Sequence, residues 1–163
     1  TNVPMPFLEA DVASLDLIVS LNIRAAFLVA QAAARIMDRQ GGGVIIHMSS
    51  TFGKVGRPGS SVYSGTKHFI EGLTKSTAVE LAPRNIRVNV IAPGPVDNEF
   101  QTDIEDRLGE RVGIDATEMI NQAIPLKRHA SADEIAGTVL FLASDQSSFS
   151  TGSVFMADGG LNA

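Results

Sequence analysis

The sequence contains no cysteine and no tryptophan, and it has a single tyrosine among its 163 residues. Without cysteine, the chain can form neither disulfide bonds nor thiolate zinc sites. No stretch is dominated by one sign of charge, because 13 basic and 18 acidic residues are spread along the chain and give a net charge of −5. Since a basic stripe is missing, we expect no nucleic-acid partner and no binding to anionic membranes.

A long uninterrupted hydrophobic run is missing as well. The most apolar stretch, residues 15–34, is interrupted by Asp16, Asn22, Arg24 and Gln31, so we do not expect it to span a membrane. No targeting segment is visible, and we expect a cytoplasmic protein. Apolar residues make up 44% of the chain and charged residues 19%, which is typical of a soluble globular protein, and 163 residues fit one domain.

The sequence does contain an alternation of helix and strand patterns. Asp11 is a good N-cap for a first long helix, which the glycines at 41–43 end. A short buried strand is predicted over 44–48, a second helix from 61 to about 81, and a second strand over 87–92 that Pro93 and Gly94 stop. This order predicts an α/β fold with a parallel sheet and crossover helices.

The last third of the chain has a different pattern. Residues 98–124 form a weakly patterned insert with helical stretches, which we interpret as a lid over a substrate. Ser131 and Glu134 form a capping box that opens a further helix through Leu142. A last strand is predicted over 153–157, followed by a glycine-rich turn at 158–160.

Four polar residues could carry chemistry: Asn22, Ser50, Tyr63 and Lys67. Tyr63 and Lys67 are four positions apart on a predicted helix, so their side chains share one face. A free phenol has a pKa of about 10, and a neighbouring ammonium group is expected to lower the pKa of Tyr63 toward neutrality. Ser50 follows the carboxyl end of a strand, where open α/β sheets place their ligands.

The polar residues also have plainer interpretations. Ser50 alone is ordinary loop polarity, and Asn22 alone is a satisfied buried amide or a kink in its helix. His47 alternates with its neighbours in the strand and is expected to be packed rather than catalytic. His68 and His129 have no carboxylate or histidine at ligand spacing, so we expect no metal site.

Taken together, these residues and their spacings resemble the short-chain dehydrogenase/reductase family. Residues 44–50 are similar to that family's strand ending in the catalytic serine, and residues 62–67 are similar to its tyrosine-x-x-x-lysine helix. Residues 86–94 resemble the following strand with its proline-glycine stop, and residues 155–160 resemble the terminal strand and turn. The likeness extends over essentially the whole chain and implies the C-terminal part of a Rossmann-like, doubly wound parallel sheet.

The resemblance implies an NAD(P)-dependent oxidoreductase that interconverts a hydroxyl and a carbonyl group of a small molecule. Tyr63 would transfer the proton, Lys67 would lower its pKa and hold the nicotinamide ribose, Ser50 would orient the carbonyl, and Asn22 would fix a water. The implied cofactor contacts are Tyr63, Lys67, Pro93, Gly94, Val96 and Asn98, and the implied substrate contacts are Ser50, Phe52, Pro95 and Phe100. A homo-oligomer, either a tetramer or a dimer, is implied as well.

Two departures from the family pattern matter. Asn98 stands where the family commonly has threonine, although an amide can still hydrogen-bond a cofactor. The glycine-rich turn that cradles a pyrophosphate is missing, because the glycines at 41–43 follow a helix and precede a strand, the reverse of a dinucleotide fingerprint. We therefore expect roughly 80 to 100 further residues before Thr1, the length of a two-unit half of such a fold.

Two interpretations from other classes remain open. One is a binding or structural module with the same fold and no turnover, which the missing glycine-rich turn favours. The other is a serine acyl-transferase, because Ser64 and Lys67 match a serine-x-x-lysine motif, although the partner motifs of that class are absent.

Overall fold

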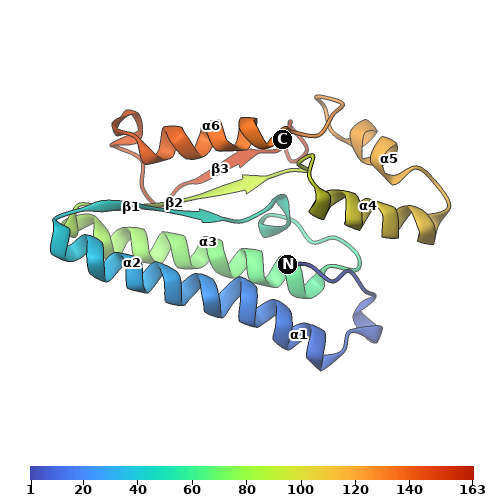
Figure 1. Ribbon diagram of the computed structural model, residues 1–163, viewed down its shortest axis with the longest axis horizontal. Coiled ribbons are helices and arrows are strands. Elements are labelled where there is room, and N and C mark those ends of the chain that lie inside the picture. The colour runs from blue at the N-terminus through green and yellow to red at the C-terminus, as the bar shows by residue number, and fades with distance from the viewer.

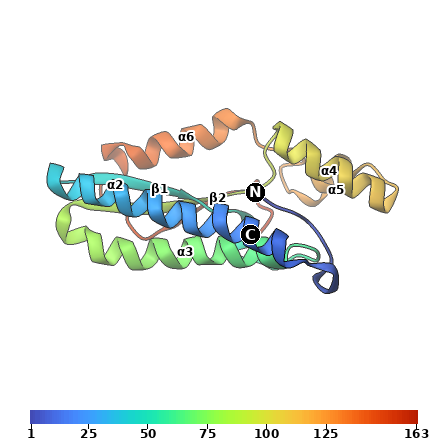
Figure 2. The same cartoon turned by 60° about the horizontal axis from the view of Figure 1, so that its bottom comes forward.

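The computed structural model describes residues 1–163 as three layers, with helices on both faces of a parallel sheet (Figure 1). The sheet consists of β1 (Gly43–Met48), β2 (Ile86–Pro93) and β3 (Val154–Ala157). The helices are α1 (Val12–Val19), α2 (Ala26–Gln40), α3 (Ser61–Leu81), α4 (Glu99–Val112), α5 (Ala116–Ala123) and α6 (Ala132–Ala143). Figure 2 shows that α2 and α3 cover one face of the sheet and α6 the other. This arrangement confirms the predicted fold class.

The central strand β2 forms the core of the molecule. It pairs in parallel with β1 and with β3, so that the strand order is β1-β2-β3. Its residues Val88, Val90, Ile91 and Ala92 are fully buried. Because all three strands run the same way, Ser49 and the residues that follow β2 and β3 meet at one edge of the sheet, which is the edge where ligands bind in open α/β folds.

A π-helical segment, Ser20–Ala25, joins α1 to α2. Asp11 caps the start of α1 by accepting a hydrogen bond from the Ser14 amide at 2.7 Å, and Gly41 ends α2 in the left-handed conformation at φ 86°. Both ends were predicted from the sequence. The continuous helix Val12–Gln40 has 29 residues and is long and apolar enough to cross a membrane by length and composition, so the expectation that it does not stays a prediction.

The second half of the chain follows the sequence pattern closely. Helix α3 spans the predicted residues, and the insert at 98–124 consists of the two helices α4 and α5, which lie beyond the carboxyl ends of the strands (Figure 1). Both halves of the Ser131–Glu134 capping box are formed at the start of α6. Strand β1 has a neighbour on one side only, because β2 is its single partner.

Candidate active site

Tyr63 and Lys67 lie on the same face of α3 within its first two turns. The ammonium nitrogen Nζ of Lys67 is 5.4 Å from the centre of the Tyr63 ring. It donates a hydrogen bond to the main-chain oxygen of Met48, the last residue of β1, at 3.0 Å. The start of α3 is thereby tied to the carboxyl end of a strand, and the phenol and the amine are neighbours, as their spacing predicts.

Ser50 lies two residues after the end of β1 and opens a tight turn at Thr51–Gly53. Its hydroxyl oxygen accepts a hydrogen bond from the Phe52 amide at 3.3 Å, which holds the side chain at the start of the turn. The Phe52 ring packs edge-on against Tyr63, with 5.6 Å between the ring centres. The turn therefore brings Ser50 and Phe52 to the tyrosine, and these predicted site residues do lie together.

The pKa of Tyr63 differs from the expectation. Burial of the phenol raises its pKa above the usual value, and the Ser50 side chain opposes this rise as a hydrogen-bond partner. The prediction that the pKa of Tyr63 falls toward neutrality is therefore wrong for this structure, because removal of the phenol from water outweighs the influences that lower the pKa. Burial also lowers the pKa of Lys67 itself. At neutral pH Tyr63 is consequently a protonated phenol, the form that can donate a proton.

Asn22 is buried in the π-helical segment, and this placement combines the two plain interpretations of the residue, a satisfied amide and a distorted helix. Its Nδ2 donates hydrogen bonds to the Thr1 main-chain oxygen at 2.9 Å and to Thr66 Oγ1 at 3.1 Å. The Thr66 hydroxyl in turn donates to the main-chain oxygen of Tyr63 at 2.7 Å. Asn22 is thus connected to the backbone of Tyr63 through Thr66, a residue that the sequence analysis did not select.

The turn after β2 packs closely against the turn after β3. Gly94 donates its amide hydrogen to the Ala157 oxygen at 2.9 Å, and a Cβ atom at Gly94 would lie only 2.9 Å from the Cα of Asp158. The Asp158 carboxylate accepts hydrogen bonds from the Gly160 and Asn162 amides, which fixes its own turn. Only glycine fits at position 94, because the neighbouring group is backbone and cannot move aside.

Residues 95–100, which follow Gly94, include the remaining residues predicted to contact the cofactor or the substrate. Pro95 and Val96 bridge to Ala130 just before α6. Asn98 caps α4, and its Oδ1 accepts a hydrogen bond from the Gln101 amide at 3.0 Å, so that its NH₂ group is the part left to reach a ligand. Phe100 lies on the first turn of α4 and is 48% exposed.

A buried polar network holds the two helices of the insert together. Glu105 on α4 accepts hydrogen bonds from Gln101, Thr117 and His129, the last from Nε2 at 2.6 Å. His129 also contacts Asn121 on α5 at 2.8 Å through Nδ1. Burial alone would raise the pKa of Glu105, but the three hydrogen bonds lower it below the usual value. Glu105 is 24 residues from His129 along the chain, so no local spacing predicts that the two side chains meet.

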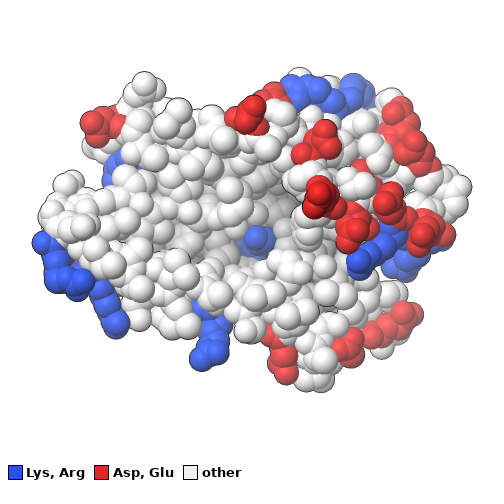
Figure 3. Space-filling model, in the orientation of Figure 1, with Lys and Arg blue, Asp and Glu red and all other residues white.

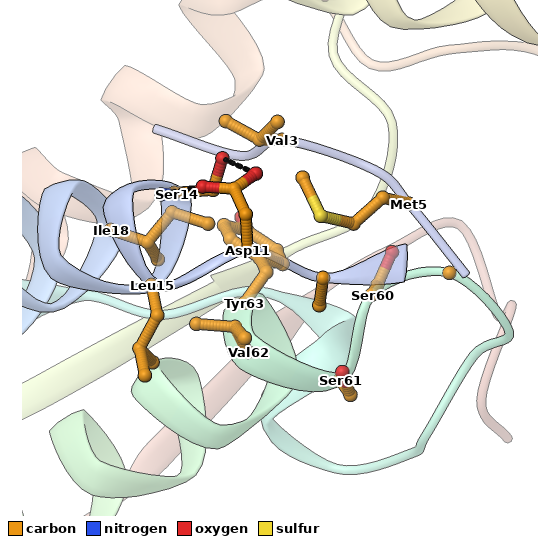
Figure 4. Close-up of a pocket in the computed structure, with 12 residues that line it drawn as sticks. Val3, Met5, Asp11, Ser14, Leu15, Ile18, Ser60, Ser61, Val62 and Tyr63 are labelled. Carbon is orange, nitrogen blue, oxygen red and sulfur yellow. Dashed lines mark hydrogen bonds between the residues drawn. The ribbon is translucent and has the colours of Figure 1, made fainter. Parts of the chain in front are cut away.

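Two hollows lie near these residues. The one in Figure 4 lies between the N-terminal segment, the start of α1 and the start of α3, and Tyr63 is among its lining residues. Its volume of about 10 Å³ is close to the minimum for one water molecule, so it is too small for an organic substrate. A hollow of about 390 Å³ lies beside Asn98 and is lined almost entirely by polar residues of α4, α5 and the start of α6.

The surface charge is uneven around the site. Figure 3 shows acidic side chains gathered over the end of the molecule that holds α4 and α5, while the face over the sheet is largely uncharged and hollowed near its centre. The acidic residues of this end include Glu99, Asp103, Asp106, Glu110, Asp115 and Glu118.

The comparison with known proteins agrees with the geometry. The family described as enoyl-(acyl carrier protein) reductase matches residues 1–162. The 3-oxoacyl-(acyl-carrier-protein) reductase FabG of Thermotoga maritima is 40% identical over 146 residues, which cover 90% of this chain and 56% of that protein.

This chain belongs to the short-chain dehydrogenase/reductase family.

Other members of the short-chain dehydrogenase/reductase family show similar likeness. The 3alpha-hydroxysteroid dehydrogenase of Mediterraneibacter gnavus is 44% identical over 142 residues, which are 87% of this chain and 54% of that protein. The crystal structure of levodione reductase has a TM-score of 0.93 and 34% identity over 98% of this chain and 62% of that one. ElxO with NADP bound has a TM-score of 0.88 and 29% identity over 99% of this chain and 63% of that one. The chain thus spans just over half the length of the curated relatives it matches.

One further buried residue lies beside the site of this short-chain dehydrogenase/reductase and is not among the residues predicted from the sequence. Glu71 lies one turn after Lys67 on the same face of α3 and is 5% exposed. The sequence does contain an indication of this residue, because Glu71 follows Lys67 at the same four-residue spacing that relates Lys67 to Tyr63. The partners of this carboxylate, Ser49 and Lys54, lie on either side of Ser50, and no helical spacing reveals them.

Proposed function

We propose that the protein carrying this chain is an NAD(P)-dependent oxidoreductase that interconverts a hydroxyl and a carbonyl group by hydride transfer. The observation that carries this proposal is the meeting of Ser50, Tyr63 and Lys67 at the carboxyl edge of the sheet, with the Lys67 ammonium 5.4 Å from the Tyr63 ring. A protonated phenol, a hydroxyl and a cation at one point form a set that can bind and protonate a carbonyl oxygen.

The residues around this point fit a nicotinamide nucleotide. The ammonium group of Lys67 and the Tyr63 hydroxyl can hydrogen-bond ribose hydroxyls, and Gly94 follows the carboxyl end of β2. Pro93, Val96 and the NH₂ group of Asn98 complete the set that we assign to cofactor contact. When bound, a nicotinamide supplies or accepts the hydride.

We assign the proton transfer to Tyr63. Because burial raises the pKa of Tyr63, the phenol stays protonated at neutral pH and can donate to the oxygen of a carbonyl that is being reduced. Ser50 donates a hydrogen bond to the same oxygen and orients it. Lys67 stabilises the phenolate left behind, and Asn22 anchors the helix that carries both residues and is proposed to fix a water that leads toward Lys67.

We propose a ketone or secondary alcohol of a small molecule as the substrate. The names of two relatives refer to a 3-oxoacyl thioester and a 3alpha-hydroxysteroid, which share this functional group. Phe52 and Pro95 are proposed as walls of the binding site, with α4 and α5 as a lid that carries Phe100. No further group on the substrate is assigned.

We also propose a homo-oligomer, a dimer or a tetramer, in the cytoplasm. The continuous helix Val12–Gln40 leaves large apolar side chains exposed: Leu15, Leu17, Leu21, Phe27, Leu28, Val29 and Ile36. Monomeric soluble proteins rarely expose so many large apolar side chains on one element. A second copy of the chain would cover this surface.

The proposal is tested with the protein expressed from its complete reading frame. NADH and NADPH are titrated by fluorescence, and a panel of ketones and secondary alcohols is then screened at saturating cofactor for a change in absorbance of the nicotinamide. We expect saturable binding of at least one of the two cofactors and turnover of at least one ketone. Saturable binding with no turnover over the whole panel would favour the silent binding module instead.

A further inference from the structure

The face of α3 that carries the proposed site has three polar members. Tyr63, Lys67 and Glu71 follow one another at four-residue steps, so they form one row along the helix. The proposed function uses the first two and leaves Glu71 without a role. Its carboxylate is nonetheless buried at 5% exposure, and a buried carboxylate is costly unless it is paired and hydrogen-bonded.

The partners of Glu71 all come from the segment around Ser50. Oε2 forms an ion pair with Lys54 Nζ at 2.6 Å, and Oε1 accepts a hydrogen bond from the Ser49 hydroxyl at 3.3 Å. The Ser49 hydroxyl also lies 3.3 Å from the main-chain oxygen of Lys67. Glu71 thus contacts the residue before Ser50 and the residue four positions after it, and it holds the turn from both ends.

The main chain of the turn packs directly against this carboxylate. A Cβ atom at Gly53 would lie 2.6 Å from Glu71 Oε1, so the main chain at this position passes directly over the carboxylate. The turn is short, because the Gly53 amide bonds back to the Ser50 oxygen at 2.9 Å. A shift of the carboxylate would therefore move the backbone of the turn and, with it, Ser50.

We propose that Glu71 is a positioning residue that holds the 49–54 turn against α3, so that the Ser50 hydroxyl stays at Tyr63. This inference rests on the proposed function, because it assigns Glu71 its role through Ser50. Two elements that are apart in the sequence, the turn after β1 and the third turn of α3, are joined through this carboxylate.

The consequence for Tyr63 can be measured. The Ser50 side chain lowers the pKa of Tyr63, so a displaced Ser50 lets that pKa rise further. Oxidation of an alcohol needs the phenolate as the base, and its rate rises with pH through the pKa of Tyr63. Glu71→Gln should therefore shift this rise in kcat to higher pH, as Ser50→Ala should, and the double variant should be shifted no further than Ser50→Ala alone.

The experiment compares Glu71→Gln, Lys54→Met and Lys54→Arg with the wild type, in the protein expressed from its complete reading frame. We expect kcat at pH 7 to fall about tenfold or more in Glu71→Gln and Lys54→Met, the scale of a lost positioning contact, while the cofactor Kd changes less than twofold. Lys54→Arg keeps the ion pair and should retain most of the activity. Amide hydrogen exchange at 49–54 should quicken in the first two variants. Asp38→Asn, which removes the exposed ion pair with Arg84, is the matched control and should behave as wild type.

Separate results overturn the inference and the proposed function. If Ser50→Ala shifts the pH profile and Tyr63→Phe abolishes turnover, but Glu71→Gln and Lys54→Met keep the wild-type pH profile, Glu71 has no positioning role, whatever its effect on melting temperature. If Tyr63→Phe retains full activity, the proposed function itself is wrong. Should Glu71→Gln fail to fold, Lys54→Met decides the question, because Lys54 is one-third exposed and its loss does not remove the buried group.

Discussion

The buried pair of Glu105 and His129 gives the sharpest test of how the insert is held in place. His129→Phe keeps an aromatic ring at a position that is 10% exposed but removes both of its polar contacts, to Glu105 at 2.6 Å and to Asn121 at 2.8 Å. A hydrogen bond to a charged group contributes about 1.5–3 kcal/mol, and a neutral one about 0.5–1.5 kcal/mol. Gln101 and Thr117 still hydrogen-bond the carboxylate in the variant. We therefore expect a loss of about 2–3 kcal/mol in the free energy of unfolding, within the range for a broken buried polar contact.

The effect should depend on pH in a defined direction. The folded-state pKa of Glu105 lies below its usual value, so the stability it contributes is fully present above its unfolded-state pKa of about 4.3. That contribution is lost as the pH falls through the folded-state pKa. The difference in stability between wild type and Glu105→Gln should accordingly be largest at neutral pH and should shrink below about pH 4.

Urea unfolding, followed by circular dichroism at a series of pH values, measures both effects. Glu118→Gln on α5 is the matched control, because Glu118 is exposed and contacts only its own helix, and we expect a change within about 0.5 kcal/mol. The reasoning is refuted if His129→Phe is as stable as the wild type at pH 7. It is also refuted if the effect of Glu105→Gln grows as the pH is lowered.

Three further predictions follow from the site and the surface. Lys67→Ala should weaken nicotinamide binding and lower kcat together, since one ammonium group has two proposed partners. Steady-state kinetics and a fluorescence titration measure both quantities, and a change in only one of them would contradict the prediction. Gly94→Ala should destabilise the protein by about 1–3 kcal/mol, the usual range for overpacking, because its Cβ would meet the Asp158 backbone; an unchanged melting temperature would contradict this. Leu28→Arg should reduce the oligomer measured by light scattering, because Leu28 is half exposed on the apolar face of α2, whereas an unchanged mass would mean that this face is not the interface.

The elements with local signals could be predicted from the sequence. Asp11 and Ser131 predict helix starts because an N-cap side chain accepts a hydrogen bond from a main-chain amide only two or three residues later. Gly41 ends a helix because glycine adopts a positive φ without strain. Tyr63 and Lys67 could be paired in advance because a four-residue helical spacing fixes their relation. In each case the physical cause lies within a few residues of the signal.

The parts that escaped prediction depend on contacts across the fold. Glu105 meets His129 only because α4 folds back toward the start of α6, and Glu71 acquires its role only when the turn after Ser50 packs on α3. The pKa of Tyr63 depends on how much water the fold removes from the phenol, which no spacing reveals. The sequence correctly identified the partners of Tyr63 but not the direction in which its pKa moves.

The measurement that tests the role of Tyr63 most directly is a single-turnover reduction of a ketone substrate by Tyr63→Phe with NAD(P)H bound. Phenylalanine keeps the ring that packs on Phe52 and removes only the hydroxyl. We predict that the cofactor binds with nearly the wild-type Kd while hydride transfer slows by about 10²–10⁴-fold, the contribution of a positioned general acid. Hydride transfer within a few-fold of the wild-type rate would contradict the assignment of the proton to Tyr63.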